Sequence, residues 1–336
     1  MNSDDTVAVL GAGNWGSTIA HMIGENGFPV RLWSRDAAQV AEIENTRQNP
    51  GAMQGLTLSD RVHADVDMRR VVRGASAVIL VVPCQAMREV ARALGDVLTT
   101  EQIVVHASKG LELGSHKRMS EIIAEETCAK RIGVIAGPNI ATEIAAGAPA
   151  GTVVTSRFPD VVRRSKRLLA SNRFMVFAGA DVIGVELCGA LKNVVAIAAG
   201  MAAEMNVGEN ALALLITRGL AEITAIASSF GAKPATLAGL AGVGDLTVTC
   251  RSKHSRNHRV GAALARGASL DEALRALGMV AEGVATSQAA HELAEQRGIR
   301  APLFEQVHRV LYGGVSPHAA LEELLRMPTG RDVAWS

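Results

Sequence analysis

The segment from Glu186 to Ala198 places a lysine and an amide among apolar residues. It reads Glu-Leu-Cys-Gly-Ala-Leu-Lys192-Asn193-Val-Val-Ala-Ile-Ala, which predicts an apolar helix that carries Lys192. A buried amine must lose its charge or find a partner. An amine in such a setting can act as a general acid or base. The alternative is a lysine that extends along the helix to solvent, and the sequence leaves both interpretations open.

A second polar segment follows a glycine-rich turn. Gly242-Val-Gly-Asp245 precedes the run Ser255-Arg256-Asn257. A guanidinium can bind phosphate oxygens through two parallel N–H groups, and Ser255 and Asn257 can add donors. The alternative is a basic surface loop that binds nothing, or that binds nucleic acid non-specifically. The net charge of +1 argues against nucleic acid as a partner.

The histidines and cysteines do not predict a metal site. His254 and His258 have i, i+4 spacing, but no acidic third ligand is nearby, so we expect no metal. The four cysteines are scattered, and none forms a CxxC pair: Cys84, Cys128, Cys188 and Cys250. This usage predicts neither disulfides nor a zinc framework and favours a reducing cytoplasm. The acidic N-terminus is unlike a signal peptide.

A glycine-rich loop near the N-terminus predicts a dinucleotide site. Val7–Leu10 reads as a strand, Gly11-Ala-Gly13-Asn14-Trp15-Gly16 follows at once, and a helix begins there. In that context the first glycine makes the turn, the second lets a diphosphate approach and the third lets helix and strand pack. The helix N-terminus supplies N–H donors for the anion. The alternative is a glycine turn without a ligand.

The end of the second strand bears on the choice of cofactor. The run Leu32-Trp-Ser34-Arg35 ends where NAD-binding folds usually carry an acidic residue for the ribose 2′-hydroxyl. An arginine there suits a 2′-phosphate, so Arg35 favours NADP over NAD. Asp36 follows directly and weakens that inference, and Arg35 could also be a solvated loop charge.

The elements that position these residues divide the chain into two halves. Short, mostly continuous apolar runs in the first half predict strands of a parallel sheet buried on both faces, with helices between them. These runs are Val7–Leu10, Val30–Trp33, Ala77–Val82, Ile103–Ala107, Ile132–Ala136, Thr152–Thr155 and Phe174–Phe177. After Gly179, Ala- and Leu-rich helical patterns take over. We predict a doubly wound, Rossmann-like domain over residues 1–180 and an all-helical domain over 181–336.

The composition fits an ordinary globular protein. Hydrophobic residues make up 48% and charged residues 20%, while aromatic residues reach only 3%, so aliphatic side chains must build the core. The most apolar stretch, Gly184 to Ala203, contains Glu186 and Lys192. A membrane span would bury both charges, so we interpret the stretch as a buried core helix and expect no stable membrane insertion.

With these motifs in place, the chain resembles the bacterial type of NAD(P)-dependent glycerol-3-phosphate dehydrogenase over essentially its whole length. The resemblance rests on many ordered motifs, of which no single one would suffice. They are Gly11-Ala-Gly-Asn-Trp-Gly16, Leu32-Trp-Ser-Arg35, Val82-Pro83, Ser108-Lys-Gly110, Ala136-Gly-Pro-Asn-Ile-Ala141-x-Glu143, Glu186-x-x-Gly-Ala-Leu-Lys-Asn193, Gly208-Glu-Asn210, Ile216-Thr-Arg-Gly219, Gly242-Val-Gly-Asp-Leu246, Ser255-Arg-Asn257 and Glu282-Gly283.

The resemblance implies a Rossmann-like domain, a helical C-terminal domain like that of 6-phosphogluconate dehydrogenase, and a reaction. Hydride would pass reversibly between C2 of sn-glycerol 3-phosphate and the nicotinamide, giving dihydroxyacetone phosphate. Lys192 matches the proton acceptor, Lys109 a lysine between cofactor and substrate, and Asp245 a substrate contact that orients Lys192. The family also implies a homodimer in the cytoplasm that supplies phospholipid synthesis.

The remaining site residues follow from the same resemblance. Gly137 and Asn139 match the substrate-side loop. Ser255, Arg256 and Asn257 match contacts to the substrate phosphate, with Arg256 also near the cofactor. Further expected cofactor contacts, beyond Lys109 and the three glycines Gly11, Gly13 and Gly16, are Asn14, Trp15, Arg35, Ala141, Val280 and Glu282.

The chain departs from the family pattern at two places. Asn139 stands where many members have Ser or Thr, and Asn49-Pro-Gly-Ala-Met-Gln54 lacks the aromatic residue that many carry near the adenosine. Two alternatives to this family stay open. One is a related dehydrogenase of β-hydroxyacids or sugar phosphates. The other is a nucleotide-sensing protein that has lost the chemistry, against which the retained Lys192 and phosphate cluster argue.

Overall fold

A computed structural model describes residues 5–278 and 280–328, which form two compact units. The first unit comprises residues 5–109 and 117–182, and the second comprises residues 110–116 and 183–328. The loop 110–116, although it lies between elements of the first unit in the sequence, therefore packs with the second.

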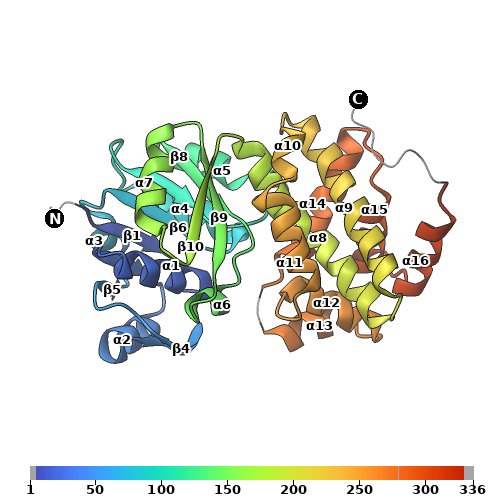
Figure 1. The fold of residues 1–336 in the computed structure, drawn as a ribbon, viewed down its shortest axis with the longest axis horizontal. Coiled ribbons are helices and arrows are strands. Elements are labelled where there is room, and N and C mark those ends of the chain that lie inside the picture. Colours follow the sequence, from blue (N-terminus) through green and yellow to red (C-terminus); the bar gives the residue numbers. More distant parts are fainter. Residues whose placement is uncertain (1–4, 279, 329–336) are drawn as a thin grey trace. The chain divides into compact units, whose positions relative to one another are not determined.

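The first unit is built on an eight-stranded sheet with the order β10-β9-β8-β7-β6-β1-β2-β5 (Figure 1). The strands of this sheet are β1 Val7–Leu10, β2 Val30–Trp33, β5 Val62–Asp65, β6 Ala77–Leu80, β7 Ile103–His106, β8 Ile132–Ala136, β9 Ala150–Ser156 and β10 Phe174–Gly179. A separate hairpin pairs β3 Gln48–Asn49 with β4 Met53–Thr57. The predicted doubly wound sheet is therefore confirmed.

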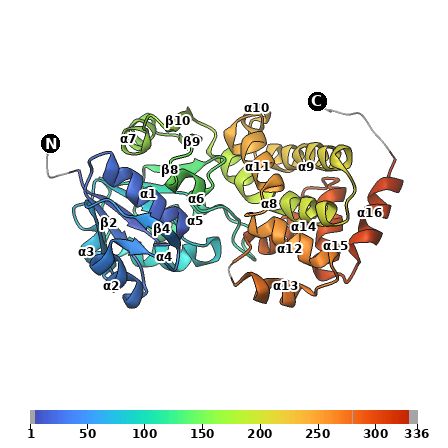
Figure 2. The same cartoon turned by 60° about the horizontal axis from the view of Figure 1, so that its bottom comes forward.

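Helices cover both faces of this sheet, because alternate strand residues point to opposite sides. On one face Val7 and Val9 pack in a core with helices α1 and α7, and on the other Ala8 and Leu10 pack with α3, α4 and α5 (Figures 1 and 2). The helices of this unit are α1 Asn14–Glu25, α2 Ala37–Thr46, α3 Met68–Val72, α4 Met87–Gly95, α5 Met119–Glu126, α6 Ala141–Ala145 and α7 Pro159–Leu169. A short 3₁₀ turn, η1, spans Cys84–Ala86.

One feature of the sheet corrects the prediction of a wholly parallel arrangement. Strand β9 pairs antiparallel with β8, whereas β10 pairs parallel with β9. The link between β8 and β9 contains only the five-residue helix α6. A parallel neighbour is usually reached through a crossover helix that runs along one face of the sheet, whereas an antiparallel neighbour needs only a chain reversal. The prediction also missed β5, whose mostly polar sequence, Val-His-Ala-Asp, lies at the sheet edge.

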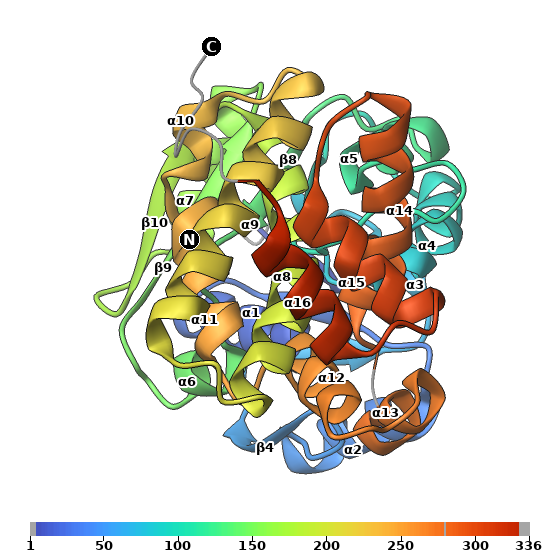
Figure 3. The same cartoon turned by 90° about the vertical axis from the view of Figure 1, so that its right-hand side faces the viewer.

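The second unit is helical and is organised around one buried helix, α8 Val182–Glu204 (Figure 3). Every residue from Gly184 to Ala202 is buried, which confirms the interpretation of this stretch as a core helix. The other helices are α9 Glu209–Ser229, α10 Pro234–Leu237, the π-helical turn η2 Leu240–Gly244, α11 Asp245–Arg251, α12 Arg256–Ala265, α13 Leu270–Leu277, α14 Glu282–Gln296, α15 Pro302–Tyr312 and α16 Pro317–Arg326.

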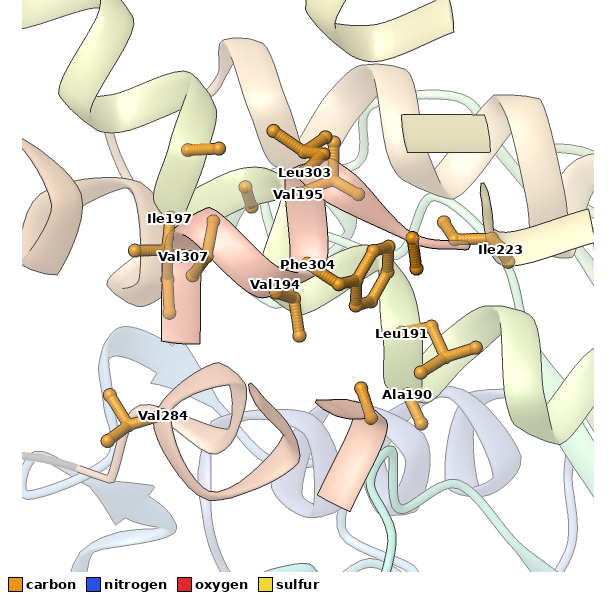
Figure 4. Packing of buried hydrophobic residues seen from close by; sticks show 14 of the residues in the cluster. Ala190, Leu191, Val194, Val195, Ile197, Ile223, Val284, Leu303, Phe304 and Val307 are labelled. Carbon is orange, nitrogen blue, oxygen red and sulfur yellow. The ribbon is translucent and has the colours of Figure 1, made fainter. Parts of the chain in front are cut away.

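Aliphatic side chains and one phenylalanine fill the core of this unit. Figure 4 shows the ring of Phe304 beside Val194 and Leu191 of α8, and Phe304 is fully buried. The predominance of aliphatic residues around Phe304 agrees with a chain in which only 3% of residues are aromatic. Burying one such side chain stabilises the fold by roughly 1.5–3 kcal/mol.

A buried carboxylate joins helix α9 to the start of helix α15. The two carboxylate oxygens of Glu222 accept hydrogen bonds from the N–H groups of Leu303, at 3.0 Å, and Phe304, at 3.2 Å. These are donors that the first turn of a helix leaves without an intrahelical partner. Burial raises the pKa of Glu222 to about 7, although the two backbone hydrogen bonds oppose that rise.

Two helices of this unit, α8 and α9, are long and apolar enough to cross a membrane by length and composition alone. The relevant window of α8 is 89% buried inside the protein, whereas that of α9 is 28% buried. The apolar character of α8 is therefore explained by its place in the core. Helix α9 presents apolar side chains such as Leu214, which is 57% exposed.

Candidate active site

The glycine loop lies between β1 and α1 in the middle of the sheet, where two of its glycines meet backbone. Gly11 has a φ of +118°, and a Cβ on it would lie 2.3 Å from the carbonyl oxygen of Val81. A Cβ on Gly16 would lie 1.8 Å from the carbonyl oxygen of Gly11. Both positions therefore require glycine for the turn and for the packing of helix on strand, as the motif predicts.

Gly13 differs because no atom lies within 4 Å of the position that a Cβ would take. It is exposed and is the N-cap of α1, which begins at Asn14. The open space over Gly13 and the helix N-terminus behind it form a cradle suited to a diphosphate. The residues present therefore fit a dinucleotide. The Trp15 ring packs against Phe174, with 6.4 Å between ring centroids.

Two charged residues, Arg35 and Asp36, follow the end of β2. Arg35 is exposed. The carboxylate of Asp36 accepts hydrogen bonds from the backbone N–H groups of Ala38, at 2.9 Å, and Gln39, at 3.2 Å, and so caps helix α2. Both hydrogen bonds go to the same oxygen, Oδ1, so the Asp36 carboxylate serves as the cap of its own helix.

The substrate-side residues of the first unit lie beyond the carboxyl ends of β7 and β8. Lys109 follows β7, and its Nζ donates to the carbonyl oxygen of Gly137, which follows β8, at 3.1 Å. The Nδ2 of Asn139 donates to Thr152 Oγ1 at 2.9 Å, so that amide group is turned toward β9. Ala141 is the first residue of α6. The carboxyl ends of parallel strands are where ligands bind in such sheets.

In the second unit, Lys192 is buried and paired. Its Nζ lies 3.1 Å from the Asp245 carboxylate and donates a hydrogen bond to the Thr249 hydroxyl at 2.6 Å. Lys192 and Asp245 are 4% and 2% exposed, so the alternative that this lysine reaches solvent is wrong. A buried charge pair of this kind needs additional hydrogen bonds to be satisfied. Thr249 provides one of them. Its hydroxyl donates to the Asp245 carbonyl oxygen at 2.6 Å and accepts the hydrogen bond from Lys192.

The turn that precedes Asp245 packs closely against the end of helix α10. The residues Leu240–Gly244 form a π-helical turn, and a Cβ on Gly242 would lie 1.8 Å from the carbonyl oxygen of Leu237. Cys250, on the same helix as Asp245, is fully buried. Burial raises the pKa of its thiol to about 12, with the Asp245 carboxylate acting in the same direction and Lys192 opposing it. Cys250 is therefore a packing residue and not a nucleophile.

The predicted phosphate cluster lies at the start of α12. Ser255 caps that helix by accepting the N–H of His258 at 3.3 Å, and Arg256, its first residue, is exposed. The side-chain oxygen of Asn257 accepts the N–H of Gly283 at 2.9 Å, where α14 begins. This leaves the amide N–H groups of Asn257 as its donors for a ligand.

Asn257 therefore links the predicted phosphate site to the predicted cofactor contacts that precede and begin α14. Val280 is 50% exposed, and Glu282 is the first residue of that helix. A Cβ on Gly283 would lie 2.7 Å from both the Asn193 carbonyl oxygen and the Asn257 side-chain oxygen. Glycine is thus required where α8, α12 and α14 meet.

The structure brings the predicted residues into two groups, one in each unit. The sequence interpretation missed Thr249 as a member of the second group. The i, i+4 spacing of Asp245 and Thr249 on one helix was a signal that could have identified it. Within residues 5–278 and 280–328, no group of three or more His, Cys, Asp or Glu side chains is arranged to hold a metal ion.

Comparison with known proteins gives one consistent result. The family model for the N-terminus of NAD-dependent glycerol-3-phosphate dehydrogenase matches residues 6–161, and that for the C-terminus matches residues 181–322. A protein from an Exiguobacterium species, named glycerol-3-phosphate dehydrogenase (NAD(P)+), is 42% identical over 96% of this chain and 95% of its own length. A Pseudomonas putida protein of the same name is 43% identical over 99% of this chain and 97% of its own.

The solved structures agree with the sequence comparisons. The crystal structure of a glycerol-3-phosphate dehydrogenase from Coxiella burnetii superimposes with a TM-score of 0.93 and 36% identity. The match covers 97% of this chain and 100% of the other.

Proposed function

The chain belongs to the NAD-dependent glycerol-3-phosphate dehydrogenase family, and from that premise we propose how its residues carry out the reaction. The enzyme interconverts sn-glycerol 3-phosphate and dihydroxyacetone phosphate with NAD or NADP. The buried Lys192–Asp245–Thr249 group is the observation that carries the proposed mechanism, because it holds an amine in one orientation away from bulk water. The nicotinamide, when bound, accepts or supplies the hydride at C2.

Lys192 moves the proton that accompanies the hydride. In reduction its ammonium group gives a proton to the oxygen that develops at C2, and in oxidation the free amine accepts the hydroxyl proton. Asp245 keeps the amine in place and stabilises its charged form. Thr249 accepts one of the three N–H donors of Lys192, which restricts the direction of the other two.

The other proposed site residues bind and orient. Lys109, Gly137 and Asn139 bind the substrate, and Ser255, Arg256 and Asn257 bind its phosphate. The glycine loop, with Asn14 and Trp15, binds the diphosphate of the cofactor. Ala141, Val280 and Glu282 complete the cofactor contacts, to which Lys109 and Arg256 also contribute.

We propose that NADP is favoured over NAD. The support is that Arg35 is exposed at the end of β2, whereas the neighbouring Asp36 carboxylate is engaged as a helix cap. A guanidinium can pair with a 2′-phosphate through two hydrogen bonds. An arginine that is only a solvated loop charge would give no such preference.

The wider setting is also part of this proposal. We infer a homodimeric, cytoplasmic enzyme without stable membrane insertion that supplies glycerol 3-phosphate for phospholipid synthesis. Residues 1–180 would form the cofactor domain and residues 181–336 the substrate domain. The exposed apolar side of α9, including Leu214, supports a subunit contact, which size-exclusion chromatography of Leu214→Glu would test.

Steady-state assay of the purified chain tests the proposed reaction. Dihydroxyacetone phosphate should drive oxidation of NADPH, while ketopantoate and tartronate semialdehyde should not. Lys192→Ala should abolish turnover and leave the dissociation constant of NADPH unchanged, because Lys192 is not among the residues proposed to bind the cofactor. Wild-type turnover in that variant would show that another group transfers the proton.

A further inference from the structure

The glycine loop is held from behind by a network of amide side chains that the proposed mechanism does not use. The carbonyl oxygen of Ala12, between Gly11 and Gly13, accepts hydrogen bonds from Asn49 Nδ2 at 2.8 Å and from Gln39 Nε2 at 3.0 Å. Asn49 lies in the short strand β3 and Gln39 on helix α2. Both elements are distant from the glycine loop in the sequence, and both donate to the same carbonyl group. Asn49 is only 2% exposed.

Every side-chain amide proton of this pair has an acceptor. Besides Ala12, Asn49 Nδ2 donates to Ser17 Oγ at 2.8 Å, and Gln39 Nε2 donates to Asn49 Oδ1 at 3.0 Å. Gln39 Oε1 accepts the hydroxyl of Ser34, at the end of β2, at 2.6 Å. The network therefore has one consistent orientation, since turning the Asn49 amide over would place its oxygen against the Ala12 carbonyl oxygen.

Because the peptide bond is planar, the orientation of the Ala12 carbonyl group also fixes the orientation of the Gly13 N–H. In a trans peptide, the C=O of Ala12 and the N–H of Gly13 point in opposite directions. A carbonyl oxygen of Ala12 held by two donors therefore directs the Gly13 N–H away from those donors. The same anchoring keeps a partial negative charge from facing an anion. A peptide flip would reverse both effects.

We propose that Asn49 and Gln39 are positioning residues that keep the Ala12–Gly13 peptide in the orientation that binds the cofactor diphosphate. The inference rests on the proposed function of the glycine loop. It assigns a role to Asn49 in a segment where the family's aromatic residue is missing: Asn49 acts on the loop from behind and does not contact the adenosine. The affinity of ligands that carry a diphosphate should depend on this network, and that of ligands without one should not.

Calorimetric titration of the full-length protein with ADP-ribose and with adenosine tests the proposal without turnover. Asn49→Asp keeps the shape of the side chain but removes two donors and places a carboxylate against the Ala12 oxygen. We expect its dissociation constant for ADP-ribose to rise about tenfold or more, since each lost hydrogen bond reduces the preference for the binding orientation of the peptide severalfold. The dissociation constant for adenosine and the KM for dihydroxyacetone phosphate should stay at their wild-type values.

Two further variants keep the test decisive. Gln39→Met removes one donor to Ala12 from a partly exposed position, so it should fold even if Asn49→Asp does not, and should weaken ADP-ribose binding selectively. Gln48→Ala, at an exposed position next to Asn49, should leave both dissociation constants unchanged. Equal weakening of both ligands, or unchanged ADP-ribose binding in a folded variant, would overturn the proposal. A wild-type protein that binds neither NADPH nor NADH would instead overturn the proposed function.

Discussion

Replacing Thr249 by valine tests whether a hydroxyl on α11 orients the amine that transfers the proton. Thr249 Oγ1 accepts a hydrogen bond from Lys192 Nζ at 2.6 Å, and valine keeps the shape of the side chain while removing that oxygen. A hydrogen bond to a charged group is worth about 1.5–3 kcal/mol. If the bond holds the amine in its reactive orientation, kcat should fall by about 10- to 150-fold.

The assay is steady-state reduction of dihydroxyacetone phosphate, followed by the absorbance of NADPH. The KM for NADPH should not change, because Thr249 is not among the residues proposed to bind the cofactor. Thr249→Ser should restore most of the rate, since serine returns the hydroxyl. Thr247→Val, at an exposed position on the same helix, is the matched control. A Thr249→Val enzyme with wild-type kcat, or a Thr247→Val enzyme that is equally slow, would refute this reasoning.

Three other predictions concern the phosphate site, the cofactor preference and the stability of the helical unit. Arg256→Ala should raise the KM for dihydroxyacetone phosphate about tenfold or more, as expected for a lost charged hydrogen bond; an unchanged KM would place the phosphate elsewhere. Arg35→Ala should lower kcat/KM with NADPH but not with NADH, and an equal loss with both cofactors would contradict the 2′-phosphate contact. Glu222 has its pKa raised from 4.5 to about 7 by burial, so its contribution to stability is complete below pH 4.5 and is lost as the pH rises through 7. Relative to wild type, Glu222→Gln should therefore gain up to about 3 kcal/mol of unfolding free energy between pH 5 and pH 8 in urea titrations, and a constant difference would argue against the raised pKa.

Much of the first unit could be predicted because its strands are buried on both faces. Val7–Leu10 is fully buried between two helical layers, and such a strand reads as a continuous apolar run. The edge strand Val62–Asp65 could not be found in this way, since only its first residue is buried. The antiparallel direction of β9 depends on how the chain returns after β8, which no local pattern of side chains records.

A site residue could be predicted only where its local sequence is unusual. Lys192 could be identified because a charged group in an apolar helix is anomalous and requires a partner. Thr249 could be identified only from its i, i+4 spacing to Asp245, because threonine hydroxyls often bond to a carbonyl group one turn earlier in a helix and the residue type alone is therefore not a signal. Asn49 and Gln39 meet Ala12 only after the chain has folded, which is why the network behind the glycine loop has no signature in the sequence.

The burial of α8 determines when the Lys192 side chain becomes ordered. Because Lys192 lies within an unbroken buried stretch of this helix, its side chain becomes ordered in the same cooperative step that forms the core. A lysine side chain that is ordered only on binding would lose roughly 1.5–2 kcal/mol of conformational entropy at that moment. In this protein the Lys192 side chain loses that conformational entropy during folding. The amine is preorganised before any ligand arrives, and the binding free energy of a small triose phosphate is not reduced by it.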